Sequence, residues 1–214
     1  MKSNAYEWPA RNPSAAWLLP VLLVLAIGLA AFAGLRAWQS QSPAEASADV
    51  TFARDMMAHH EQAVEMALIV RDRSSDAALK ELALDMLLTQ QAQIGQMQGW
   101  LAAWGLPFSG AQPPMQGMGQ SMGMASQKQL DELRSLPVAQ AEIAFLNLMI
   151  RHHQGGVAMA QTALPQARRA EVKRLAESMI TSQQNEIDYM QTLLRQRGSA
   201  PAPQPTMMPM DMQH

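Results

Sequence analysis

The sequence has no cysteine among its 214 residues. That absence excludes disulfide bonds, iron–sulfur clusters, thiolate metal sites and a lipid attached to an N-terminal cysteine. Positive charge is also scarce: 16 Lys and Arg stand against 18 Asp and Glu, the net charge is −2, and no basic run extends beyond a short pair such as Arg168-Arg169. Nucleic-acid binding requires a basic surface that neutralises phosphates, so we exclude nucleic acid as a partner.

Methionine is abundant instead, with 18 residues against five histidines, and neither type is evenly distributed. Four of the histidines form two adjacent pairs, His59-His60 and His152-His153. Eight of the methionines lie in two segments that are also rich in Gly, Gln or Pro. Without cysteine, any soft ligand for a metal ion must be a methionine thioether.

The segment 15–36 has no charged residue before its last position. At about 1.5 Å per residue, such a helix crosses a hydrocarbon core of about 30 Å, so we predict a transmembrane anchor. Lys2 and Arg11 precede it, which places residues 1–14 in the cytoplasm and the rest of the chain outside. A signal peptide cleaved near residues 31–33 is the alternative. Both interpretations export the remaining domain.

An internal repeat organises the rest of the chain. A shift of 93 residues places Phe52 on Phe145 and His59 on His152, and about a third of positions 52–101 are identical without a gap. An ungapped match of this length indicates a duplicated structural unit. Further matched pairs are Met56 with Met149, His60 with His153, Met66 with Met159, Met86 with Met179, Gln90 with Gln183 and Met97 with Met190.

Each unit has the apolar period of a helical hairpin. Ser74-Ser75 interrupts the period in the first unit and supplies an N-cap, whereas Pro165 separates the two helices of the second. Ser126 and Gln129 have the spacing of a capping box for a short helix between the units. The predicted long helices cover about residues 49–72, 76–104, 137–163 and a last stretch ending at 197.

One apolar stripe on each helix cannot be buried alone, so two hairpins that pack face to face are expected. The predicted fold class is all-α: a ferritin-like up-and-down four-helix bundle of two repeated hairpins, with an N-terminal transmembrane helix. The predicted boundaries are a linker over 37–47, the bundle over 48–197 (repeat one 49–104, a Met-rich loop 105–126, repeat two 137–197) and a disordered Met/Pro-rich tail over 198–214.

The histidine pairs and several methionines fall on the buried faces of these helices, at about 100° per residue. A single such histidine is more often a hydrogen-bonded core residue, and methionine readily fills core space. Here the combination repeats in register, and a shared metal ion is a partner that suits four buried imidazoles. The predicted ligands are Met56, His59, His60, Met149, His152 and His153, with Met97 and Met190 from the neighbouring helices and with Met66 and Met159 at a second position or in the core.

Thioether and imidazole together favour Cu(I), and silver is also accommodated. Zinc remains an alternative for the histidines, although it leaves the methionines unexplained. Glu186 is the one carboxylate expected to face inward on the second helices, so a carboxylate-bridged di-iron site is not supported. Gly155-Gly156 replaces Gln62-Ala63 of the first repeat and predicts a close helix contact beside the site.

The two Met-rich segments are predicted to be loose, because neither has the pattern of a core. Closely spaced thioethers in such segments can capture Cu(I), with compositional drift as the alternative. The first carries four methionines between residues 115 and 124, and the second carries Met207, Met208, Met210, Met212 and His214.

The stretch DMMAHHEQAVEMA, its echo FLNLMIRHHQGGVAMA and the following QQAQIGQM and QQNEIDYM resemble the domain-of-unknown-function 305 family. The resemblance covers about residues 48–197. It implies a ferritin-like bundle, export in bacteria and, in some members, periplasmic copper binding linked to copper resistance. Ala58 and Arg151, before each histidine pair, depart from a common family pattern.

We therefore expect an extracytoplasmic copper-binding protein that sequesters or delivers Cu(I) and is not an enzyme. Its expected location is the bacterial inner membrane, with a single pass and a periplasmic C-terminal domain. A copper-handling protein is an expected partner besides copper ions and the membrane. The alternatives are a redox-active metalloprotein of the ferritin-like class and a metal-free interaction bundle.

Overall fold

The computed structural model describes residues 18–39 and 42–200, which form six helices and no strand. The chain divides into two units, residues 1–42 and 43–214. The first contains helix α1 (Leu18–Gln39), whose described side chains are exposed. Within the described ranges, no helix has the combination of length and hydropathy that crossing a membrane requires. The predicted anchor over 15–36 is therefore not confirmed, and its first three residues lie outside the description.

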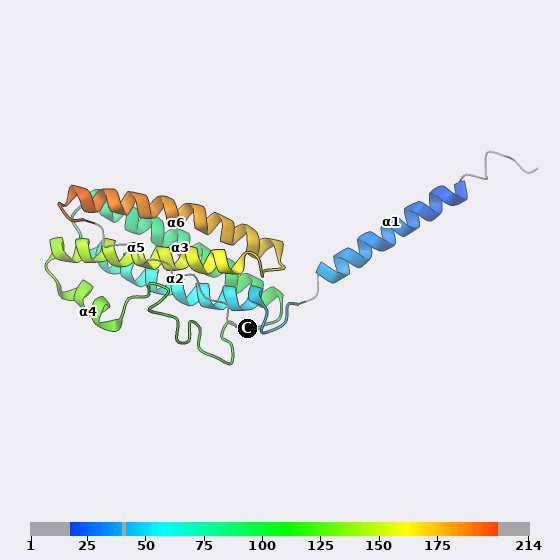
Figure 1. The fold of residues 1–214 in the computed structure, drawn as a ribbon, viewed down its shortest axis with the longest axis horizontal. Coiled ribbons are helices and arrows are strands. Elements are labelled where there is room, and N and C mark those ends of the chain that lie inside the picture. Colours follow the sequence, from blue (N-terminus) through cyan, green and yellow to red (C-terminus); the bar gives the residue numbers. More distant parts are fainter. Residues whose placement is uncertain (1–17, 40–41, 201–214) are drawn as a thin grey trace, which may run out of the picture. The chain divides into compact units, whose positions relative to one another are not determined.

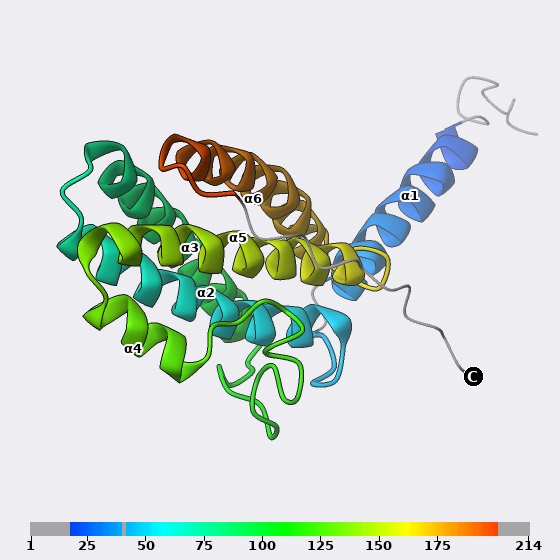
Figure 2. The ribbon, with the colours of Figure 1, turned by 60° about the vertical axis from the view of Figure 1, so that its left-hand side comes forward.

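Four long helices form a bundle in the second unit (Figures 1 and 2). Helix α2 packs on α3, α5 packs on α6, and the two hairpins meet through α2 and α5. The all-helical prediction is thus confirmed for the described part of the chain. The helices are α2 (Ala48–Arg73), α3 (Ala77–Ala103), α5 (Val138–Ala163) and α6 (Ala170–Gln196), with a short α4 (Gln127–Ser135) between the hairpins.

Side-chain caps explain where several helices begin. Ser47 accepts a hydrogen bond from the Val50 amide at the start of α2. Helix α4 begins with the predicted capping box between Ser126 and Gln129. The prediction that Ser74-Ser75 caps α3 is wrong: Asp76 is the N-cap, accepting from Leu79 N at 3.1 Å. An aspartate cap also complements the positive end of the helix dipole.

Helix α6 has no side-chain cap of its own and is capped from another helix. Asp49, 2% exposed at the start of α2, accepts hydrogen bonds from the backbone amides of Arg168 and Arg169 at 3.0 to 3.2 Å. Arg169 is the N-cap residue of α6. One buried carboxylate therefore joins the start of the first repeat to the last helix of the second.

We expect Asp49→Ala to destabilise the bundle by about 3 kcal/mol, because two backbone amides at the start of α6 lose their acceptor and the α6 dipole loses a nearby negative charge. Urea unfolding followed by circular dichroism measures the change. Asp72→Ala is the matched control, since the Asp72 side chain is 73% exposed. Equal stability of both variants and the native chain would contradict this role for Asp49.

The bundle core has two halves along its length. The first half brings the C-terminal part of α2 against the N-terminal part of α5, and the second brings the opposite ends of these helices together. Helices α2 and α5 are therefore antiparallel, which is the arrangement produced by a twofold axis perpendicular to the helices. In both helices the histidine pair lies in the register between the two halves.

Candidate metal centre

The four helix histidines lie in one buried layer across the middle of the bundle, each at most 1% exposed. The rings of His59 and His152 stack, with centroids 3.6 Å apart and an interplanar angle of 27°. The ring of the adjacent histidine lies farther away in each repeat. The centroids are 6.4 Å apart for His59 and His60, and 6.3 Å apart for His152 and His153. This matches the divergence of about 100° between adjacent helix positions. The repeat thus produces one pair in contact and two outlying imidazoles.

The outlying imidazoles are held by repeat-related residues. His60 Nε2 lies 2.7 Å from Gln93 Oε1 on α3, and His153 Nε2 lies 2.5 Å from Glu186 Oε2 on α6. Both oxygens accept, so Nε2 carries the proton in each ring. The two acceptors occupy the same position in the two repeats but differ in charge: one is an amide and the other a carboxylate.

Backbone carbonyls hold the stacked pair. His59 Nε2 donates to Met122 O at 3.0 Å, and His152 Nε2 donates to His59 O at 2.9 Å. All four imidazoles therefore donate from Nε2 to an oxygen, and in a neutral ring this leaves Nδ1 as the atom with a free lone pair. A metal-ligating histidine usually shows this arrangement, because the hydrogen bond at one ring nitrogen orients the other toward the metal.

Buried polar atoms that have no hydrogen-bond partner gather at this layer in the described part of the chain. They include Nδ1 of three imidazoles, and leaving such atoms unpaired in a core costs free energy. A metal ion would use those lone pairs, so the residues fit one. The atoms are Nδ1 of His59, His60 and His153, both amide atoms of Gln90 and Oε1 of its repeat mate Gln183, with Gln154 Oε1 nearby in sequence.

The imidazoles of His59, His60 and His152 are in the neutral form that binds metal. Burial lowers the pKa of His59 to about 4 and, together with the nearby His59, that of His60 to about 3. Burial, and then the neighbouring histidines, lower the pKa of His152 well below its ordinary value. These rings are neutral near pH 7, and binding a metal there requires no proton release from them.

The methionines form two groups, one on each side of the histidine layer. The twofold relation between the repeats places Met56 and Met149 in different groups, on opposite sides of the layer. Among His, Asp and Glu side chains alone, the described residues contain no group of three or more placed to hold an ion. Met56, Met97 and Met179 belong to one half of the core with Met159 partly buried against it, whereas Met149, Met190, Met66 and Met86 belong to the other.

The Met-rich loop is not the loose segment that its composition predicts. Met115 and Ala125 are buried, and Gln62 on α2 forms hydrogen bonds to both the amide and the carbonyl of Ala125. We call residues 115–125 the strap. Hydrogen bonds to its backbone and close backbone contacts hold the strap, and neither leaves an apolar pattern in the sequence. The second Met-rich segment, residues 201–214, lies outside the described residues.

Gly155 also differs from its prediction. A Cβ on Gly155 would lie 1.8 Å from Met122 O of the strap, so this glycine makes room for the strap and not for a helix. Gly156 does approach a neighbouring helix, because its Cβ would lie 2.5 Å from Gln183 Oε1 on α6. Sequence reasoning missed the roles of Met122 O and Gln62, and the only available signal was the replacement of Gln62 by Gly155 between the repeats.

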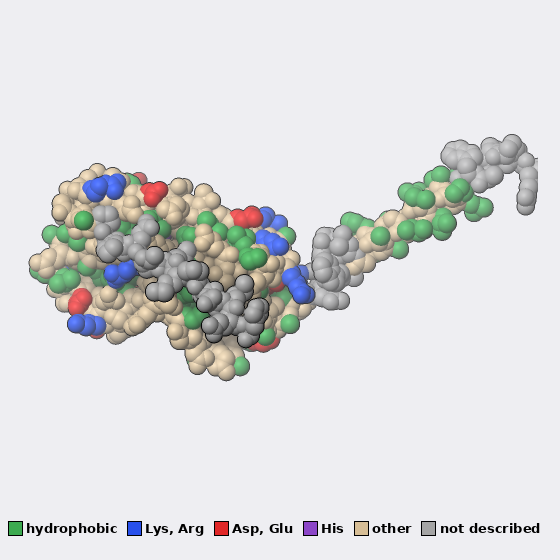
Figure 3. Space-filling model, viewed as in Figure 1, with side chains coloured by type: hydrophobic (Ala, Val, Ile, Leu, Met, Phe, Trp, Pro, Cys, Tyr) green, Lys and Arg blue, Asp and Glu red, His purple; other side chains and the backbone are tan. Residues whose placement is uncertain are grey.

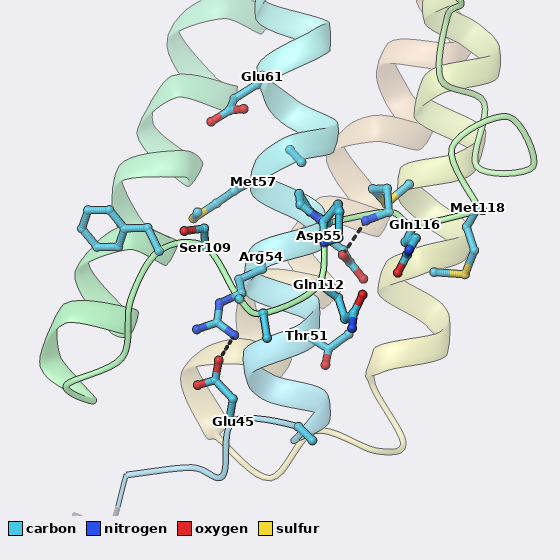
Figure 4. Close-up of a pocket in the computed structure, with 18 of the residues that line it drawn as sticks. Glu45, Thr51, Arg54, Asp55, Met57, Glu61, Ser109, Gln112, Gln116 and Met118 are labelled. Atoms are coloured by element: carbon cyan, nitrogen blue, oxygen red, sulfur yellow. Dashed lines mark hydrogen bonds and ion pairs between the residues drawn. The ribbon is translucent and has the colours of Figure 1, made fainter.

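A cavity of about 680 Å³ lies between the outer face of α2 and the segment leading into the strap (Figure 4). Arg54 borders it and bonds Glu45 and the Pro107 carbonyl, while Asp55 accepts from the Met115 amide. None of the four imidazoles lines this cavity. On the face shown in Figure 3, acidic and basic side chains are sparse and interspersed, and no described histidine is visible. The histidine layer is therefore separate from the cavity.

A helical bundle with a buried layer of imidazoles and flanking thioethers defines the general class, a helical protein with a candidate metal centre. The family model for DUF305, a domain of unknown function, matches residues 49–194. The chain belongs to the DUF305 family, as the sequence resemblance predicts.

Several solved structures are similar to this chain, and two of them are of DUF305 proteins. A DUF305 protein from Streptomyces coelicolor is 46% identical, with a TM-score of 0.70, covering 75% of this chain and 100% of its own. A DUF305 fragment from Deinococcus radiodurans is 41% identical, with a TM-score of 0.65 and coverages of 70% and 96%. CopM in its Cu(I)-bound form is 26% identical, with a TM-score of 0.56 and coverages of 69% and 96%. CopM has also been crystallised with Cu(II) and with Ag. No curated protein matches the sequence.

Proposed function

We propose that this chain is an extracytoplasmic copper-binding protein that sequesters or delivers Cu(I), and not an enzyme. The observation that carries the proposal is the set of buried Nδ1 atoms without a hydrogen-bond partner, between two groups of buried thioethers. Imidazole and thioether are the donor set that suits Cu(I). The copper-bound and silver-bound forms of CopM support the same cargo.

Each repeat supplies one half of the proposed centre. In the first, Met56 and Met97 lie on one side of His59 and His60; in the second, Met149 and Met190 lie on the other side of the layer. We assign these residues with His152 and His153 as candidate ligands, and Met66 and Met159 to the surrounding core. The relation between the hairpins is the one expected of a ferritin-like bundle. Zinc would use the imidazoles alone and leave the thioethers without a role.

The proposed location is the periplasmic side of the bacterial inner membrane, with residues 15–36 as the anchor. Its support is the uncharged apolar sequence of that segment. In an exported chain without cysteine, the soft ligands for copper are thioethers, whose oxidation to the sulfoxide is reversible. A copper-handling protein would then receive or supply the ion.

The direct test is Cu(I) binding by the full chain in anaerobic competition with a chromogenic Cu(I) chelator, together with elemental analysis after purification from copper-supplemented cells. Bound copper that the chelator cannot remove at equal concentration is expected. Zinc in the purified protein, with no competition for Cu(I), would contradict the proposal. Absence of both binding and any rise in melting temperature with metal would favour a metal-free interaction bundle.

The acceptor of His153 provides a finer test. We expect Glu186→Gln to weaken Cu(I) binding by about 10- to 100-fold, because a carboxylate at Nε2–H increases the basicity of the ligating nitrogen. Gln93→Glu is the matched variant and should strengthen binding through His60. The competition assay measures both. Equal affinities in the native chain and Glu186→Gln would show that His153 does not ligate the ion.

A further inference from the structure

The two repeats differ at one position beside the histidine layer, and the strap explains both residues found there. In repeat one, Gln62 bonds Ala125 through both amide atoms, with Oε1 accepting at 2.6 Å and Nε2 donating at 2.9 Å. In repeat two, its mate Gly155 has no side chain, and the Met122 carbonyl occupies the space where a Cβ would stand. Gln62 therefore holds the strap by hydrogen bonds, and Gly155 leaves room for the strap backbone. We call the Gln62–Ala125 hydrogen bonds the latch.

Further contacts seat the strap on the same side of the bundle. Gly123 has φ +75°, and a Cβ there would lie 2.1 Å from the Arg151 carbonyl, so the strap backbone lies directly on α5. At its other end the Asp55 carboxylate accepts from the Met115 amide at 2.8 Å, and Figure 4 shows this side chain pointing to the strap. Figure 2 shows the segment lying across α2 beside α5.

The strap also touches the proposed centre itself, because the His59 ring donates to the Met122 carbonyl. Opening the strap would free the Nε2–H of His59 and expose one side of the layer. The strap carries soft donors at its surface: Met118 is 43% exposed, and Met122 and Met124 are partly buried. The segment that closes over the imidazoles is thus also one that can carry a Cu(I) ion to them.

We propose that the strap is a gate for metal at the histidine layer. Metal enters and leaves when the Gln62–Ala125 and His59–Met122 hydrogen bonds open together, and the strap thioethers exchange the ion with the outside. Closed, the strap holds His59 in the orientation that directs Nδ1 inward. This inference rests on the proposed function, since it concerns access to the same centre.

The test is the Gln62→Ala variant of the full chain, loaded with Ag(I) or Cu(I). We expect metal release to a chelator in stopped flow to be about tenfold faster, because the latch hydrogen bonds are lost, with stoichiometry unchanged. Amide hydrogen exchange at residues 122–125 should rise in the metal-free protein. Gln91→Ala, which removes an exposed amide from α3, is the matched control and should match the native chain in both measurements.

Gly155→Ala provides a second variant, because its Cβ displaces the strap without removing the latch. Faster release in both variants supports the gate. Unchanged release where local exchange has risen would show that the strap moves without controlling access, and unchanged exchange in Gln62→Ala would show that Gln62 is not a latch. Either result overturns the gate while leaving metal binding intact. A native chain that binds neither ion would instead contradict the proposed function.

Discussion

The His60→Ala/His153→Ala variant is expected to lose tight Cu(I) binding, with an affinity at least about 100-fold below that of the native chain. Each substitution removes one buried imidazole whose Nδ1 has no hydrogen-bond partner and whose Nε2 is oriented by a repeat-related acceptor. The loss should exceed that of either single variant, because the two residues belong to different halves of the layer. Competition with a chromogenic chelator under anaerobic conditions measures it.

Two further variants control for copper binding outside the layer and for loss of folding. His214→Ala removes the one histidine outside the bundle helices, and it should retain the tight binding that we assign to the buried layer. The His60→Leu/His153→Leu variant fills the vacated volume, so that loss of binding can be separated from loss of folding, which circular dichroism monitors. Native affinity in a folded double variant would reject the histidine layer as the copper site.

The metal-free bundle is expected to lose most of its stability between pH 6.5 and pH 4. The unfolded chain takes up protons at its histidines near pH 6.5, whereas the folded chain keeps His59 and His60 neutral down to about pH 4 and 3. Each such histidine therefore contributes stability that is fully present above pH 6.5 and falls by about 1.4 kcal/mol per pH unit below it. His152 acts in the same direction.

The groups that face this layer do not offset the loss of stability at low pH. Glu186 is the carboxylate at His153, the neutral Gln93 amide faces His60, and backbone carbonyls face the stacked pair. Urea unfolding of the metal-free chain at a series of pH values measures the slope. His60→Leu should reduce the slope by about one proton, or about 1.4 kcal/mol per pH unit. A free energy of unfolding that stays constant from pH 7 to pH 4.5 would contradict the neutral, buried state of the rings.

The duplication and the helical period are the features that sequence reasoning handles well. The shift of 93 residues relates Gln93 to Glu186 and one histidine pair to the other, and the structure places both pairs in one buried layer. The divergence of adjacent histidines is a property of the helix itself. These features are predictable because side-chain periodicity reports directly on which face a helix buries.

Other features were not predictable from side-chain patterns. The capping of α6 by Asp49 joins residues about 120 positions apart through backbone amides. The separation of the thioethers into two groups depends on the antiparallel contact of α2 with α5, which a repeat alone does not specify. Asp76 is the N-cap in place of Ser74-Ser75 because α3 begins at Ala77 and Asp76 directly precedes it.

By itself, the sequence determined an all-helical DUF305 chain with a duplicated unit, no thiol chemistry, and paired histidines on buried helix faces. Only the tertiary structure decided that Nδ1 is the free atom of three rings and that the strap covers the layer. The physical reason is that these features depend on backbone carbonyls and on the absence of a Cβ at Gly155. Sequence patterns report on side chains, and neither a backbone carbonyl nor a missing Cβ changes such a pattern.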